Sequence, residues 1–233
     1  MKAWAYEILQ SHHFDRFVFI DELYQELYKA QAVWLSINNF SCIPNCGVCC
    51  REYYPEITES EGLYAALCIL FEHWDNILSV TRNFDELGNN STSRNIDDVS
   101  IALQSVFPNF NDESGGCPFR SNTGPHYCLI YPGRPLVCRL FNAAGERAKD
   151  GSIRYSPCKI IKKQQKLAFS NTDSKLVVQK ITTGIPVMSD YAYRLHGNER
   201  NEKIKPIIIE MIKKILFTLH LRGDRPHDFK RVA

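Results

Sequence analysis

A short segment of this chain, SCIPNCGVCC, concentrates the residues that could do chemistry: Cys42, Cys46, Cys49 and Cys50. Thiolates are good ligands for zinc, iron and iron–sulfur clusters, and this spacing allows one loop to turn three or four of them toward one point. Gly47 permits a tight backbone path inside the loop. The ordinary alternative is a buried patch of reduced thiols, but the surrounding residues lack the periodic apolar pattern of a core element. The segment therefore predicts a metal site.

Further cysteines near the middle of the chain are predicted to complete this site, namely Cys117, Cys128, Cys138 and Cys158. The gaps between them are too long for the paired short knuckles of a zinc ribbon. Eight thiolates suffice for two four-sulfur sites, or for one closed site and a second with an open position. The sequence leaves this division open. The helix expected after Pro157 would place Cys158 in its first turn, where the helix dipole favours a thiolate. Cys68 falls in an apolar stripe and is expected to be a core residue.

Cations are expected around such a site because four thiolates around one zinc ion carry a net charge of about minus two. Arg134 and Arg139 stand close to the later cysteines. For both arginines the plain alternative is a fork onto carboxylate or carbonyl oxygens. His126 is either a further ligand or an exposed turn residue.

The separated blocks together resemble the CxxCxxCC, or YkgJ-like, cysteine cluster family, whose members are described as zinc- or iron-chelating proteins. The blocks read CIPNCGVCC, ITESE, GGCPF and CLIYPGRPLVCRLF, and the likeness covers about residues 42–158. Tyr131, Arg134, Pro135, Arg139 and Phe141 stand where the family pattern has them. The resemblance implies that Tyr131 belongs with Arg134 and Arg139 around the metal. This sequence departs from the family pattern at one point, because three residues rather than two separate Cys42 from Cys46.

That longer gap gives Cys42, Cys46 and Cys49 the C-x3-C-x2-C spacing of radical S-adenosylmethionine enzymes. Flagellin lysine N-methylases also carry a similar cysteine cluster. The alternative to a metal-binding protein without catalysis is therefore an iron–sulfur enzyme of methylation or radical type, acting on a protein or a small molecule. Val48 replaces the aromatic residue usual in radical enzymes, and no GxGxxG loop is present. Zinc and iron, including a four-iron four-sulfur cluster, remain equally compatible with sulfur ligation.

Composition limits the other classes of function. The formal net charge is only +2, and no basic stripe with interleaved aromatic residues indicates nucleic-acid binding. No apolar run approaches the roughly 18 residues needed to span a membrane, and the amino terminus does not read as a secretory signal. Nine cysteines, an odd number, suit a reducing compartment. We therefore expect a cytoplasmic protein whose partner is a metal ion; no protein partner is indicated.

Helix signals outnumber strand signals, so the sequence predicts a mainly α single domain over residues 1–233, with few or no strands. Its metal-binding core is an irregular cysteine-rich region at about 42–158, flanked by helices at both ends. A capping box at Thr58 and Glu61 predicts a helix from about Glu59. Further helices are expected at 21–36, from 97 or 98 to 106, at 159–169 and at 208–219. The segment 88–95 should be a loop, and 175–182 is ambiguous between strand and helix.

Overall fold

Helices dominate the computed structural model, as the sequence predicts. The structure describes residues 8, 10–41, 46–85, 96–113, 115–121, 128–141, 143–155, 157–168, 182–196 and 199–221. Its helices are α2 (His12–Ile37), α3 (Val48–Glu52), α4 (Glu59–Asp85), α5 (Ile96–Val106), α6 (Leu136–Leu140), α7 (Lys159–Ala168), α9 (Met188–His196) and α10 (Ile204–Leu221). Its strands form two antiparallel pairs: β1 (Glu56–Ile57) with β4 (Glu202–Lys203), and β2 (Gly145–Arg147) with β3 (Ile153–Tyr155).

The beginning of α4 confirms the predicted capping box. The backbone N–H of Thr58 donates to Glu61 Oε2 over 3.2 Å, and the N–H of Glu61 donates to Thr58 Oγ1 over 3.4 Å. These bonds satisfy amides that a helix amino terminus leaves without intrahelical partners. The helix accordingly begins at Glu59.

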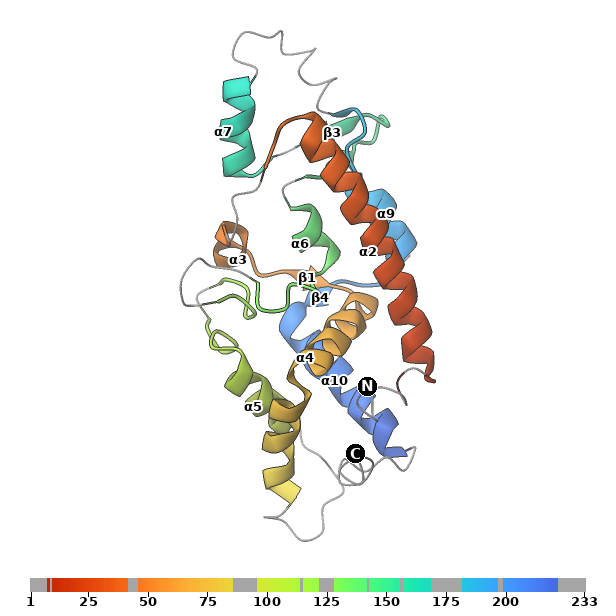
Figure 1. The fold of residues 1–233 in the computed structure, drawn as a ribbon, viewed down its shortest axis with the longest axis vertical. Coiled ribbons are helices and arrows are strands. Elements are labelled where there is room, and N and C mark those ends of the chain that lie inside the picture. Colours follow the sequence, from red (N-terminus) through yellow and green to blue (C-terminus); the bar gives the residue numbers. More distant parts are fainter. Residues whose placement is uncertain are drawn as a thin grey trace.

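The main core lies where α4, α5 and α10 pack together (Figure 1). α10 confirms the predicted carboxy-terminal helix and buries Ile208, Met211, Ile212, Ile215, Leu216 and Leu219. α5 also lies where the sequence predicts it and ends before Pro108. The apolar spacing of Leu67, Leu70, Phe71 and Trp74 predicts that all four face the core, but only three of them are buried, and Phe71 is 41% exposed. Phe71 instead lies beside Phe17 of α2 at the edge of this core, with ring centroids 6.3 Å apart.

Two helices differ from the expectation. α2 begins at His12, nine residues before the predicted start, after Ser11, whose hydroxyl donates to the carbonyl of Ile8 over 2.7 Å. α9 was not expected, because its short amphipathic pattern becomes stable only when Leu195 is buried against α2 and α6. The segment 88–95 lies outside the described residues, as does 175–182 apart from Thr182.

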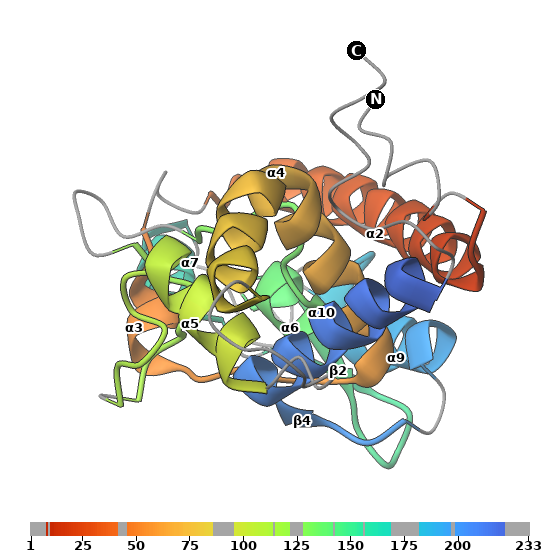
Figure 2. The ribbon, with the colours of Figure 1, turned by 90° about the horizontal axis from the view of Figure 1, so that it is seen from below.

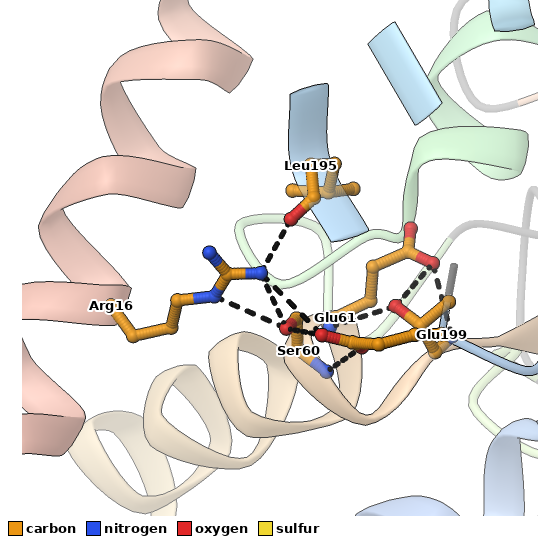
Figure 3. Close-up of polar contacts among 6 residues, drawn as sticks. Arg16, Ser60, Glu61, Leu195 and Glu199 are labelled. Atoms are coloured by element: carbon orange, nitrogen blue, oxygen red, sulfur yellow. Dashed lines mark hydrogen bonds and ion pairs between the residues drawn. The ribbon is translucent and has the colours of Figure 1, made fainter. Parts of the chain in front are cut away.

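A polar junction joins α2, α4 and α9 (Figure 3). Arg16 of α2 donates to the hydroxyl of Ser60 over 2.7 Å and to the carbonyl of Leu195 over 2.5 Å. The Ser60 hydroxyl in turn donates to Glu199 Oε1 over 2.5 Å. These contacts hold α2 and α9 against the beginning of α4, beside Glu61.

The short helices α3, α6 and α7, which contain or directly follow cavity-lining cysteines, lie to one side of the long helices α2, α4 and α10. In Figure 1, α7 and α3 follow one another along one flank of the molecule, with α6 between that flank and α2. Figure 2 shows α3 and α7 together at one end of the view, with α5 next to them and α9 at the opposite end. The frame of long helices therefore presents the cysteine-rich segments on one flank. Among the described helices, none is both long enough and apolar enough to cross a membrane.

Candidate metal centre

One cavity of about 1130 Å³ gathers the predicted metal ligands that the structure describes. Its lining includes Cys46, Cys49, Cys50, Cys117, Cys128, Cys138 and Cys158. Cys42 and His126 lie outside the described residues. Cys68 packs with the cluster that contains Tyr24, Tyr64 and Leu136, in keeping with the predicted core position. Cysteines separated by more than a hundred positions in the sequence thus line one space.

A short helix and a glycine turn bring the first cysteine segment to the second. Cys49 and Cys50 lie on α3, which follows Gly47 in the left-handed region at φ 56°. The N–H of Cys117 donates to the carbonyl of Cys50 over 2.7 Å. An added Cβ at Gly116 would lie 2.9 Å from that same carbonyl oxygen, closer than such contacts occur. The glycine before Cys117 is therefore needed for the close approach of the two segments.

Arg120, which the sequence did not single out, fixes the backbone around Cys117 and Cys128. Its guanidinium donates to the carbonyl of Cys117 over 2.9 Å and pairs with Asp112. Arg120 also forms an isolated antiparallel bridge with Cys128, and the N–H of Leu129 donates to the carbonyl of Phe119 over 2.9 Å. A buried arginine with a carboxylate partner can hold such a turn rigidly.

Glu61 positions α6, the short helix that carries Cys138. Its side chain is 4% exposed and accepts the N–H of Leu136, the first residue of α6, over 2.7 Å. It also accepts the hydroxyl of Tyr24 over 3.2 Å. One carboxylate therefore caps two helices, α4 and α6, and it lies beside the α2–α4–α9 junction (Figure 3). The capping role at α4 was predictable, whereas the second role depends on a contact 75 residues away.

The two predicted arginines take different positions, although both line the cavity. Arg139 donates to the carbonyls of Pro132 and Arg134 and lies over the ring of Tyr24, 4.0 Å from its centroid. Arg139 thus follows the plain alternative of a fork onto carbonyl oxygens and shapes the loop that carries Arg134. Arg134 lies over the exposed ring of Tyr131 at 3.7 Å, and its buried Nε has no hydrogen-bond partner within the described part of the chain.

The thiols of Cys49 and Cys50 interact directly. A hydrogen bond from the Cys50 thiol to the Cys49 sulfur lowers the pKa of Cys49 to about 6, and the nearby Arg134 guanidinium adds to this effect. The same hydrogen bond, followed by burial, raises the pKa of Cys50. A thiolate at Cys49 is therefore accessible near neutral pH, with its neighbour as the proton donor.

The remaining cysteines of this group are more deeply buried. Burial raises the pKa of Cys117 to about 12, the pKa of Cys128 to about 11 and the pKa of Cys138 well above its ordinary value. Backbone N–H groups of Phe119 and Ile130 oppose this rise by donating to the sulfurs of Cys117 and Cys128. We call the mutually interacting set Cys49, Cys50, Cys117, Cys128 and Cys138 the inner cysteines. Their charges are close enough to oppose one another, so a cation among them would be strongly favoured.

The inner cysteines surround a space rather than a point. Among the residues that the structure describes, no three side chains of His, Cys, Asp or Glu converge closely enough to hold a metal ion in this arrangement. Zinc–sulfur bonds are about 2.3 Å long, so the thiols would have to move inward to share one ion. The cavity, about 1130 Å³, is larger than one ion requires.

Cys158 and His73 also line the cavity. Cys158 immediately precedes α7 rather than lying in its first turn, and its carbonyl accepts the N–H of Lys162 over 2.9 Å. His73, which the sequence reading missed, lines the cavity at a position where α4 departs from helical geometry, with φ −117° and ψ 20°. Its ring packs edge-on against Phe107 at 5.5 Å, which accounts for its place in the wall. No periodic signal in the sequence marks this kink.

The fold and the cavity define a class of protein: a mainly α domain whose buried thiols face a common cavity. A model of the CxxCxxCC family, described as "Putative zinc- or iron-chelating domain", matches residues 41–165. This match covers more than half of the 233-residue chain, and the chain belongs to that family. No curated protein and no solved structure matches the chain. The family assignment confirms the resemblance drawn from the cysteine blocks and supports metal binding, with zinc and iron both within its description.

Proposed function

We propose that this protein binds a zinc or iron ion through thiolates of the inner cysteines, and that metal binding is its primary biochemical function. The donor set fits such an ion, because soft thiolates select zinc and iron over hard cations. Cys42, Cys46 and Cys158 remain predicted ligands of the wider set. The ion would supply the positive charge that allows several thiols to deprotonate in one buried space.

The single observation that carries this proposal is the Nε of Arg134. A buried, charged N–H group without an acceptor is costly, so its position needs an explanation. The charge of Arg134 acts on Cys49, Cys128 and Cys138, which places the guanidinium beside the inner cysteines. Metal binding converts neighbouring thiols to thiolates, which accept hydrogen bonds. The unsatisfied donor therefore fits a metal–thiolate site.

The cavity volume supports a second candidate function, an iron–sulfur enzyme of methylation or radical type. About 1130 Å³ is slightly above the usual range of about 300–1,000 Å³ for small-molecule sites, and an isolated zinc ion uses little of it. An iron–sulfur cluster with space for a substrate would use more, as an enzyme of methylation or radical type requires. The family description names zinc or iron chelation and does not mention catalysis.

Anaerobic purification followed by elemental analysis and absorption spectroscopy tests the proposal. We expect stoichiometric zinc or iron in the full-length protein and in Cys68→Ser, a cysteine variant outside the cavity. The double variant Cys117→Ser/Cys128→Ser should lose that metal. Iron with acid-labile sulfide and a broad visible absorption would favour the second candidate. Absence of both metals from anaerobically purified and reconstituted protein would refute the proposal.

A further inference from the structure

The cavity wall is built from two separately packed parts. Cys50, Cys117 and Cys128 pack on the main core formed by α4, α5 and α10. Cys158 packs instead on a small cluster whose buried members are Trp34, Phe40, Ala143, Ile161 and Ile185. Figure 1 shows α7, which follows Cys158, above α3 and away from α4, α5 and α10. Cys158 therefore faces the inner cysteines from a different support.

Backbone contacts join the segments of Cys50, Cys117 and Cys128, and the Glu61 side chain holds the helix that carries Cys138. The Cys117 amide binds the carbonyl of Cys50, and the bridge at Arg120 brings Cys128 alongside. Glu61 attaches α6, with Cys138, to the amino terminus of α4. Movement of one inner cysteine segment thus disturbs the others, and this part of the wall behaves as one unit.

α7 is held more lightly. Of the α7 side chains that the structure describes, residues 160–164, Ile161 is the one that is buried. The side chain of Gln164 accepts the N–H of Ser41 over 3.0 Å and donates to the carbonyl of Ser41 over 2.8 Å. Within residues 160–164, α7 is thus held by the buried side chain of Ile161 and by the exposed hydrogen bonds of Gln164, and exposed hydrogen bonds exchange readily with water.

We propose that Cys158 is the exchangeable ligand of the metal site and that α7 closes the cavity when the ion binds. The inner cysteines hold the ion first, and Cys158 then adds its thiolate and draws α7 inward, which closes the open space between the walls. Release reverses this order: the bond to Cys158 breaks, a proton returns to its sulfur, and the ion is exposed to an acceptor. No oxidation or reduction is involved. This inference rests on the proposed metal-binding function.

The test measures metal release to a chromophoric chelator from the full-length protein loaded with zinc. Cys158→Ser should keep its zinc stoichiometry but release the ion at least about tenfold faster, because loss of a group that merely supports a ligand already costs about 10–100-fold in metal affinity, and loss of a ligand costs no less. Gln164→Ala keeps every thiol and loosens α7, so it should also accelerate release, by a smaller factor. Cys68→Ser is the matched cysteine control and should release at the parent rate.

Hydrogen exchange supplies a measurement that does not need a variant. Zinc should increase the protection of the α7 amides in the parent protein, and this increase should be absent in Cys158→Ser. The proposal is overturned if Cys158→Ser releases zinc at the parent rate, if it loses zinc as completely as Cys117→Ser/Cys128→Ser does, or if zinc leaves α7 protection unchanged. A parent protein that binds no metal would instead refute the proposed function itself.

Discussion

Replacing Glu61 with glutamine should destabilise the whole protein, because this carboxylate accepts hydrogen bonds on both of its oxygens. Oε1 accepts the N–H of Leu136 over 2.7 Å, and Oε2 accepts the N–H of Thr58 over 3.2 Å. An amide offers one oxygen, so its NH₂ group would face one of these backbone donors. The side chain is 4% exposed, and water therefore cannot relieve the conflict easily.

The expected magnitude follows from the cost of a buried, unsatisfied hydrogen-bonding group. That cost, with the loss of a charged acceptor, comes to about 2–3 kcal/mol. A domain of roughly this size loses about 2–4 °C in Tm per kcal/mol, so the Tm should fall by about 4–12 °C. Thermal and urea unfolding of the metal-free protein give this number without interference from metal binding. Weaker zinc retention should accompany it, since α6 carries Cys138.

The matched control is Glu59→Gln, two residues earlier on the same helix. Glu59 forms an exposed ion pair with Lys214 Nζ at 2.6 Å, and such pairs contribute at most about 1 kcal/mol. Glu59→Gln should therefore leave both the Tm and zinc retention nearly unchanged. If Glu61→Gln is as stable as the parent, or if the two variants lose the same stability, the assignment of Glu61 as the cap of both α4 and α6 is wrong.

Three further results are expected. Gly116→Ala should cost about 1–3 kcal/mol and lower zinc stoichiometry, because its Cβ would collide with the carbonyl of Cys50; unchanged urea unfolding and zinc content would contradict this. Arg134→Met should weaken zinc binding by about 10–100-fold in chelator competition. The Tm of the metal-free variant should equal or exceed that of the metal-free parent, since the substitution removes an unsatisfied donor. A large loss of metal-free stability would contradict the assignment of Arg134 Nε as a donor reserved for metal-bound thiolates. Removing the metal with a chelator should lower the Tm, because an ion present at 1,000 times its Kd stabilises the folded state by about 4 kcal/mol. An unchanged Tm would show that the folded state does not bind the ion more tightly than the unfolded state does.

Local signals in the sequence determined the family and several helices. The cysteine blocks identified a metal-binding family, and the pair Thr58 and Glu61 located the beginning of α4. The periodic apolar residues of α10 predicted its extent to within a few residues. The two helix signals depend on neighbours one to four positions apart, which is the range over which helix caps and amphipathic faces act, whereas the family pattern is read from separated blocks of fixed residue types.

The tertiary structure alone decided how these pieces meet. It placed Arg139 on carbonyl oxygens, left Arg134 Nε without an acceptor, and gave Glu61 a second helix to cap. It also placed Cys158, directly before α7, on a different hydrophobic cluster from the main core that supports Cys50, Cys117 and Cys128. The hydrogen bonds of Arg139 are local, within seven residues, but the second role of Glu61 and the position of Cys158 depend on packing between segments far apart in the chain, where the spacing of residues carries no information. The sequence by itself therefore supplied the thiols, and the fold decided which of them line one cavity and which hydrophobic cluster supports each of them.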